Sequence, residues 1–172
     1  MQVATSDALV RPVYASDADI VYQLYRQTPD YFRIISIPIP TLSEVQHELE
    51  AAHDDPRRYT ELILAPQDVN LSAIDDPITG RKVVGYLDYK LDYPASGEAM
   101  VNLLLILERL QSSGFGRQTI LDLEKRLRGQ IKRILASIYG QNPRAERFWH
   151  SLGYRFAIDA KPILDWYAKD LG

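Results

Sequence analysis

A short loop rich in small residues carries the residue types best suited to binding phosphate. The segment Gln111-Ser112-Ser113-Gly114-Phe115-Gly116 follows the apolar run Leu103–Leu107 and leads directly into an amphipathic stretch. A buried strand that turns through such a loop into a helix presents unpaired N–H groups at the positive end of the helix dipole. The pattern therefore predicts a phosphate seat. The alternative is that Gly114 and Gly116 only permit a tight turn.

A second group of polar and aromatic residues begins at Asn142. Asn142 is a favoured helix N-cap and Pro143 a favoured first helical residue, so a helix is expected from here to Gly153. Arg144 could reach a phosphate from the first turn of this helix, and its alternative is an ordinary exposed arginine. Asn142 acts as a cap whether or not it also contacts a ligand.

The elements that must position these residues alternate between strands and helices. The order is strand, two helices, three strands, helix, strand, helix and one or two strands, which predicts an α/β or α+β fold around one mixed sheet. Residues 30–40 are predicted to form an irregular loop, and residues 67–82 a long hairpin connection. The expected strands are 9–14, 59–65, 83–91, 98–107, 131–139, 154–158 and 164–169, and the expected helices are about 16–28, 41–53, 115–129 and 142–153.

Composition bounds the class of protein. The chain has 172 residues, of which 46% are hydrophobic and 25% charged, as expected for one globular domain over residues 1–172. Its net charge of −3 argues against a general nucleic-acid binder and weakly favours a cationic partner such as an amine.

The absence of cysteine excludes disulfides and a covalent acyl-cysteine intermediate, and it fits a reducing, cytoplasmic setting. The three histidines, His47, His53 and His150, lack the spacing of a helical zinc site, so no metal is expected. The first residues do not form a signal peptide. The run Leu103–Leu107 is far shorter than the roughly 20 residues that span a bilayer, so no membrane partner is expected.

These patterns together resemble the GNAT superfamily of N-acetyltransferases, which use acetyl-coenzyme A. Gln111-x-x-Gly114-x-Gly116 is similar to the family's pyrophosphate loop, and residues 142–154 resemble its second coenzyme motif. Val10-Arg11-Pro12 with Asp17-Ala18 resembles the family's opening, and residues 165–171 resemble its last strand. The resemblance implies a GNAT-like mixed, mostly antiparallel sheet of six to seven strands flanked by about four helices.

The resemblance also implies acetyl-CoA as co-substrate and assigns residues to it. Main-chain amides from Ser112 to Arg117 would hold the pyrophosphate, with the Gln111 and Arg117 side chains as further donors. The pantetheine arm would lie where two strands splay apart, and an amide of Ile106 or Leu107 would polarise the thioester carbonyl. The expected coenzyme-binding residues are Leu105, Ile106, Leu107, Gln111, Ser112, Ser113, Gly114, Phe115, Gly116, Arg117, Asn142, Arg144 and Trp149.

The candidate catalytic residues are Glu98, Asn102 and Tyr139. Relatives often carry tyrosine at the position of Trp149, where its hydroxyl reprotonates the thiolate, and indole is no useful acid. Tyr139, Tyr154 or solvent would then supply the proton, unless none is required. Strand alternation without a bulge would place Glu98, Met100 and Asn102 on one face, with Glu98 as the nearest base acting through water. The alternative for Glu98 is an exposed carboxylate at a strand end.

The acceptor site is expected around residues 30–40, with Tyr31, Phe32 and Arg33, together with Asp88 or Tyr89. These aromatic and acidic side chains suit a cationic amine, although they could simply pack the loop. The interpretation that results is direct acetyl transfer to a primary amine of a small molecule or a peptide, with the small molecule favoured over a protein N-terminus or lysine. The alternatives are a non-catalytic acyl-CoA-binding regulatory module and a phosphate-binding protein of another fold. Relatives are often dimers, so a homodimer is one option.

Overall fold

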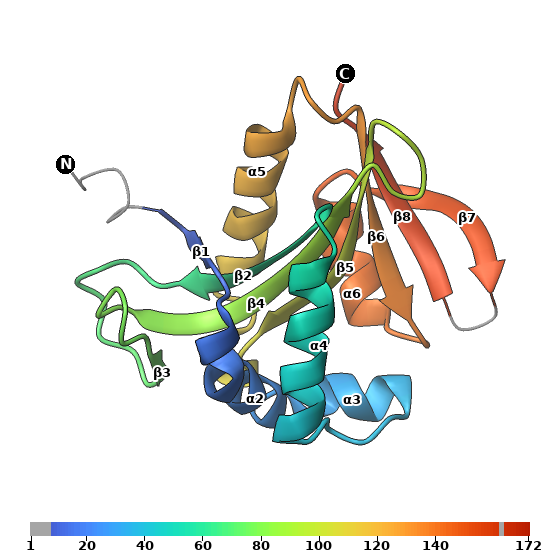
Figure 1. Ribbon diagram of the computed structural model, residues 1–172. Coiled ribbons are helices and arrows are strands. Elements are labelled where there is room, and N and C mark those ends of the chain that lie inside the picture. Colours follow the sequence, from blue (N-terminus) through green and yellow to red (C-terminus); the bar gives the residue numbers. More distant parts are fainter. Residues whose placement is uncertain (1–7, 162–163) are drawn as a thin grey trace.

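The computed structural model describes residues 8–161 and 164–172 of the chain. Over these residues it contains five α-helices, two single-turn 3₁₀ helices and eight strands (Figure 1). Their bounds are β1 Val10–Pro12, η1 Ala15–Asp17, α2 Ala18–Arg26, α3 Pro29–Ile35, α4 Leu42–Asp54, β2 Arg58–Leu64, β3 Ile74–Asp75, β4 Lys82–Leu91, β5 Glu98–Ile106, η2 Glu108–Leu110, α5 Phe115–Leu127, β6 Arg133–Tyr139, α6 Pro143–Ser151, β7 Arg155–Lys161 and β8 Leu164–Asp170.

The strands form one mixed sheet in the order β1-β2-β4-β5-β6-β8-β7, with β3 paired to β4. The β5–β6 pair is parallel, and the other strand pairs are antiparallel. The expected mixed, mostly antiparallel α/β architecture is therefore confirmed. The sheet has one more strand than the expected six to seven because β3, a two-residue strand, lies within the long connection 67–82.

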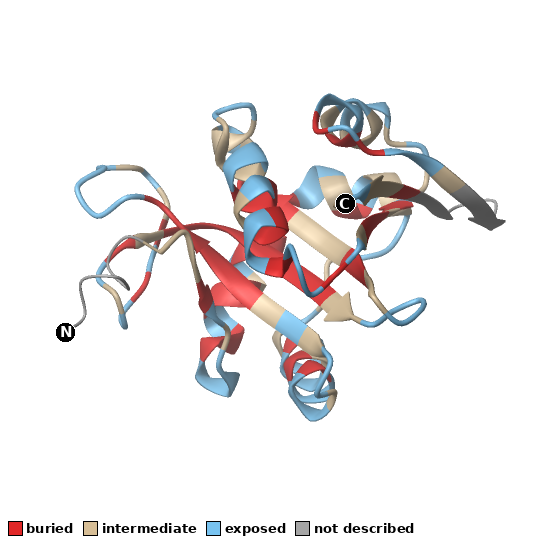
Figure 2. Cartoon of the chain, turned by 90° about the horizontal axis from the view of Figure 1, so that it is seen from above, coloured by how far each residue is buried: buried red, intermediate tan, exposed pale blue. Residues whose placement is uncertain are grey.

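Helices cover both faces of the sheet, so the fold has two hydrophobic cores. Helices α2 and α4 lie over one face, while α5 and α6 lie over the other (Figure 1). Figure 2 shows that buried residues gather along the central strands and on the helix faces that contact them. Within the described ranges, no helix is long and apolar enough to cross a membrane.

Local capping signals mark two of the helix starts. The Thr41 hydroxyl accepts a hydrogen bond from the Glu44 N–H, and the Glu44 carboxylate accepts one from the Thr41 N–H, at 3.2 and 2.9 Å. This is the capping box that the sequence predicts for α4. The Asn142 side chain accepts from the Ala145 N–H at 3.1 Å and so caps α6, again as predicted.

The prediction of an irregular loop over residues 30–40 is wrong in its first half. Pro29 is the first residue of helix α3, which runs to Ile35 and ends at Ser36 in a left-handed conformation, with φ 60°. A proline lacks an N–H, and the first residue of a helix does not use one, so proline can begin a helix as readily as it stops the preceding one.

A bulge in β5 breaks the simple alternation of its side chains. Asp88 of β4 pairs with Leu103 and Tyr89 pairs with Val101, so Asn102 is the extra residue. The expectation that Glu98, Met100 and Asn102 share one face assumed regular alternation, and that alternation ends at the bulge. Beyond it, Leu103 and Leu105 pack into the core under α2 and α4, while Leu104 and Ile106 pack into the other core. The bulge also lies at the point where β5 and β6 separate, because β5 pairs with β6 only from Glu98 to Val101.

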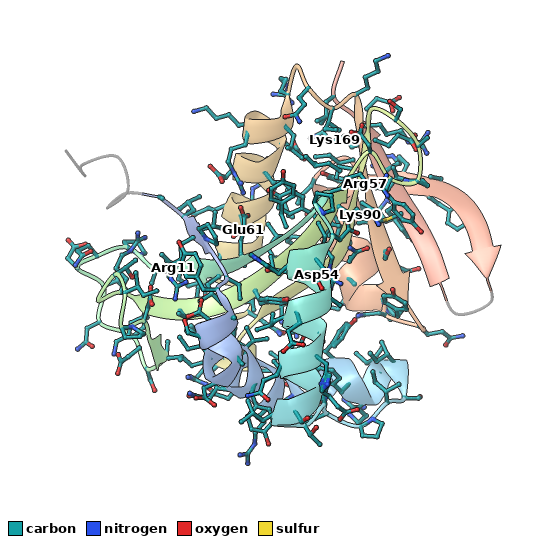
Figure 3. All side chains as sticks on the ribbon, viewed as in Figure 1. Arg11, Asp54, Arg57, Glu61, Lys90 and Lys169 are labelled. Atoms are coloured by element: carbon teal, nitrogen blue, oxygen red, sulfur yellow. The ribbon has the colours of Figure 1, made fainter. Side chains whose placement is uncertain are left out.

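Buried and half-buried ion pairs fasten the outer elements to the sheet. Arg11 of β1 donates to both Asp17 and Asp76, and all three side chains are less than a tenth exposed. Glu61 of β2 accepts two hydrogen bonds from Arg126 of α5, at 2.9 and 3.0 Å. Figure 3 labels Arg11 beside β1 and Glu61 next to α5. Such pairs fix the positions of these elements, since a buried charge without its partner is costly.

Candidate functional site

The glycine-rich loop forms the start of α5, as the sequence predicts. Ser112 and Gly114 both adopt positive φ, at 64° and 91°, and Gly114 is the N-cap residue. The first main-chain bond of the helix runs from the Gln118 N–H to the Gly114 C=O, at 3.0 Å. The N–H groups of residues 115–117 therefore lie ahead of the helical ladder, at the positive end of the helix dipole. This arrangement suits an anionic oxygen.

The first turns of α6 lie against the same loop. The Arg144 guanidinium is 3.3 Å from the Ser112 hydroxyl, so α6 places a cation over the loop. A Cβ at Gly116 would lie 3.2 Å from the Phe148 ring, so the glycine permits α5 and α6 to approach closely. Gly114 has no atom within 4 Å of an added Cβ, which leaves the space above the loop open.

The strand edges next to the loop present main-chain groups to the gap between β5 and β6. Leu104 and Ile106 stand opposite Leu87 and Gly85, while the Leu107 N–H donates to the Val84 C=O at 2.9 Å. In this alternating ladder, the N–H and C=O groups of Leu104 and Ile106 point away from β4 and into the gap.

Two of the expected donors serve the protein itself. The Leu107 N–H is bonded to Val84, so its proposed role at the thioester is corrected in favour of Ile106. The Gln111 side chain donates one N–H to the Ile106 C=O at 3.0 Å, so it holds the loop against β5.

A cavity of about 680 Å³ joins the loop, the gap and α6. Its lining includes the expected coenzyme-binding residues except Ser113 and Leu107, and it includes Asn102 and Tyr139 of the catalytic candidates. Its charged lining residues are Asp30, Arg117, Arg144 and Arg147. We call it the cationic cavity, because three guanidinium groups outweigh one carboxylate.

A second cavity of about 620 Å³ adjoins the first on the α3 and α4 side of the sheet. Its charged lining residues are Glu48, Arg58 and Asp88, so it is called the acidic cavity. The two cavities share five lining residues, namely Tyr31, Ile34, Asn102, Leu103 and Tyr139. They therefore meet at the β5 bulge and at the end of β6.

The charged residues of the acidic cavity are not equivalent. Asp88 is buried and accepts hydrogen bonds from both Nε and Nη2 of Arg58, at 3.1 and 2.5 Å. Glu48 is a third exposed and accepts a hydrogen bond from the Tyr25 hydroxyl at 2.8 Å, while Arg58 is 3.9 Å away. Burial raises the pKa of Glu48 and the Asp88 charge raises it further, against opposing contributions from Tyr25 and Arg58.

The three catalytic candidates lie in different places. Tyr139 ends β6 on the wall that both cavities share, and burial raises the pKa of its hydroxyl, with added effects of Asp88 and Tyr93. Asn102 lies on the same wall, with its Nδ2 3.4 Å from Asp88. Glu98 lines neither cavity and lies 3.8 Å from Arg133 at the other end of β5. Its proposed role as base is therefore corrected.

The expected acceptor residues also lie in different places. Tyr31, Phe32 and Asp88 line the acidic cavity. Arg33 instead points to solvent and pairs with Asp30 at 2.8 Å. Tyr89 lies on the opposite face of the sheet, stacked on Tyr59 with 5.4 Å between ring centroids, so it does not contribute to this site.

Several residues of the site were not singled out from the sequence, among them Arg58, Glu48, Gly140 and Arg147. Glu48 lies within the apolar stripe of α4 that includes Val45, Leu49 and Ala52, and a carboxylate in such a stripe is a usable signal. Gly140 allows the end of β6 to approach α3, since an added Cβ would lie 3.0 Å from the Ile34 C=O. Arg147 gave no local signal, because an exposed helical arginine is common.

Comparisons with known proteins agree with this geometry. Residues 24–154 match the model of the Acetyltransferase (GNAT) family. An acetyltransferase from Thermus thermophilus is 34% identical, with a TM-score of 0.82 over 94% of this chain and 95% of that one. No match is found among curated protein sequences.

More distant solved structures share the fold. PaiA N-acetyltransferase from Thermoplasma acidophilum, in complex with coenzyme A, is 12% identical, with a TM-score of 0.66 over 94% of this chain and 97% of that one. Spermidine N-acetyltransferase from Vibrio cholerae, in complex with CoA and spermine, is also 12% identical, with a TM-score of 0.69 over 94% of each chain. On the strength of the family match across most of its length, the chain belongs to the GNAT family of acetyltransferases.

Proposed function

We propose that this protein transfers an acetyl group from acetyl-coenzyme A directly to a primary amine. The observation that carries the proposal is the meeting of a cationic and an acidic cavity at one shared wall. The diphosphate of coenzyme A is anionic, and an amine in water is a cation. The charges of the two cavities therefore match the two substrates and would bring them together at the β5 bulge.

The cationic cavity fits the coenzyme. The free N–H groups at the start of α5 and the guanidinium groups of Arg117, Arg144 and Arg147 suit a diphosphate. The unpaired edge of β5 suits the amide-containing pantetheine arm, which can hydrogen-bond like an added strand. Acetyl-coenzyme A supplies an acyl group already activated as a thioester.

Glu48 of the acidic cavity and Tyr139 of the shared wall suit the proton transfers of the reaction. The acceptor must lose a proton before its nitrogen can attack, and Glu48 is the carboxylate free to take it, since Arg58 engages Asp88. The amine nitrogen then forms a bond to the acetyl carbon as the carbon–sulfur bond breaks, and the nitrogen releases its second proton to solvent as the amide forms. The N–H groups of Leu104 and Ile106 face the gap where the carbonyl oxygen would gain charge.

Tyr139 is suited to protonate the departing thiolate. Its hydroxyl carries a proton at neutral pH, as tyrosine ordinarily does, and its side chain lines both cavities. The chain has no cysteine, so acetyl transfer through a cysteine thioester is excluded. Direct attack by the amine is the route that these residues support.

A transfer assay tests the proposal. The protein is incubated with acetyl-coenzyme A and a panel of primary amines, and release of the thiol is measured alongside mass detection of the acetylated amine. We expect thiol release to depend on the amine, with one thiol released for each acetylated amine formed. Tight coenzyme binding without transfer to any small-molecule or peptide amine would instead favour the regulatory coenzyme-binding module.

A further inference from the structure

The acidic cavity contains one carboxylate that the protein does not neutralise. Arg58 donates to both oxygens of Asp88, so the positive charge of one side chain neutralises the negative charge of the other. Glu48 is the remaining charged residue of the lining, and it keeps only a neutral hydroxyl donor, from Tyr25, and a distant 3.9 Å approach of Arg58. The lining thus has a net charge of one negative unit, placed at Glu48.

A single cation next to Glu48 would balance this charge. The groups that face Glu48 come from four elements: Tyr25 of α2, Tyr31 of α3, Arg58 of β2, and Asp88 with Tyr86 of β4. Desolvation disfavours the ionised form of Glu48, and a bound ammonium would offset that cost. The site is therefore complementary to one positive charge.

The rest of the acidic cavity is mostly apolar. Tyr31 and Phe32 of α3 contact each other edge to face, with 5.2 Å between ring centroids, and Phe32 meets Tyr25 in the same way. Ile34, Ile35, Ile37 and Pro40 continue this wall along α3 and the segment that follows it. An apolar group on the acceptor would gain by leaving water here, whereas a second cation would lose hydration without meeting a second free carboxylate of the lining.

We infer that the acceptor is a monoamine with an apolar body, whose one ammonium group lies at Glu48 and whose hydrocarbon lies along Tyr31, Phe32 and Ile35. This inference rests on the proposed function, since it assigns the substrate class of the same reaction. Polyamines and other multiply charged amines are disfavoured, because the lining balances one positive charge and not two.

An isosteric pair of amines tests the inference. Pentylamine and butane-1,4-diamine have equal numbers of heavy atoms and differ in one terminal group, a methyl in the first and an ammonium in the second. We expect kcat/KM for acetyl transfer to favour pentylamine by at least about tenfold. Equal values, or a preference for the diamine, would overturn the inference while leaving the acetyltransferase activity established.

A binding measurement separates failure of this inference from failure of the proposed function. Each amine is titrated calorimetrically into the protein saturated with coenzyme A, a complex in which no transfer can occur. Pentylamine is expected to bind at least about tenfold more tightly than the diamine. Tighter binding of pentylamine without any turnover would contradict the proposed function but support the monoamine specificity of the acidic cavity. Equal binding of the two amines, or no binding, would contradict that specificity.

Two variants locate the specificity. Glu48→Gln is expected to weaken pentylamine binding about tenfold without changing coenzyme A affinity, while Glu50→Gln, on the exposed side of α4, should leave both unchanged. Ile37→Glu introduces a second carboxylate at a position that is 49% exposed and so tolerates charge. This variant should raise the affinity for butane-1,4-diamine relative to pentylamine, and an unaltered ratio would count against the assignment.

Discussion

The carboxylate of Glu108 accepts a hydrogen bond from the main-chain N–H of Asp30, at 2.8 Å. Asp30 is the second residue of α3, and Glu108 belongs to the turn η2 that leads into the glycine-rich loop. The N-cap residue of α3, Thr28, makes no side-chain cap bond and directs its hydroxyl to the Leu24 C=O instead. Glu108 therefore supplies the cap of α3 from 78 residues away in the chain. It joins the segment before the glycine-rich loop to the wall of the acidic cavity.

Replacing Glu108 tests this connection. Glu108→Ala removes the hydrogen-bond acceptor and the negative charge at the start of α3, which together stabilise this helix by about 1 kcal/mol. The variant should therefore loosen the wall that carries Tyr31 and Phe32. We expect KM for pentylamine to rise about fivefold, with coenzyme A affinity changed by less than about twofold. Glu108→Gln keeps an acceptor oxygen and should restore most of the loss. An unchanged KM in Glu108→Ala would show that the contact does not support the acceptor site.

The proposed acid role of Tyr139 predicts a selective loss of turnover. Tyr139→Phe removes the hydroxyl at the shared wall and should lower kcat about tenfold to a hundredfold, with little change in the affinity for coenzyme A or amine. Tyr93→Phe is the matched control, because Tyr93 neighbours Tyr139 but lines neither cavity. Steady-state kinetics and coenzyme titration check both variants. A Tyr139→Phe enzyme with normal kcat would mean that solvent protonates the thiolate.

Asp76 links the stability of the fold to pH. Burial alone raises the pKa of its carboxyl, but hydrogen bonds from Arg11, Thr79 and the Ile78 N–H hold that pKa at about 2, below its ordinary value of 3.8. A carboxyl with a lowered pKa in the folded state contributes stability that is fully present above the unfolded value. That contribution is lost as the pH falls from 3.8 towards 2.

The expected result is a pH-dependent difference between wild type and Asp76→Asn. Chemical unfolding at pH 7 should show Asp76→Asn destabilised by about 3 kcal/mol, because Arg11 loses one of its buried partners. The difference should narrow as the pH falls below about 4. Asp75→Asn, whose side chain is 84% exposed, should change the free energy of unfolding by no more than about 0.5 kcal/mol. A difference that stays constant down to about pH 2 would contradict the assignment.

Local signals in the sequence correctly predicted where several helices begin. The Thr41–Glu44 box and the Asn142–Pro143 pair mark the starts of α4 and α6, and Gly114 marks the start of α5. These features act within one helical turn, so neighbouring residues contain the information needed to recognise them. The coenzyme half of the site could be predicted for the same reason, because its loop is one continuous segment.

The acceptor half depends on contacts that the sequence does not reveal locally. Glu48, Arg58 and Asp88 come from three elements and meet only through the register of β2 with β4 and the position of α4. The bulge at Asn102 depends on how β4 pairs with β5, and no residue type at that position requires it. The start of α3 was missed because Pro29 both ends one helix and begins another.

Coenzyme A affinity in two glycine variants of α5 is the sharpest test of where the coenzyme lies. Gly114 and Gly129 flank opposite ends of the helix, share φ of 91°, and have no atom within 4 Å of an added Cβ, so glutamate imposes similar backbone strain at both. We predict that Gly114→Glu weakens coenzyme A binding at least about tenfold, since the new carboxylate repels the diphosphate at the helix start, while Gly129→Glu binds like the wild type. Equal affinity in folded Gly114→Glu and Gly129→Glu, measured by calorimetry, would contradict the placement of the coenzyme.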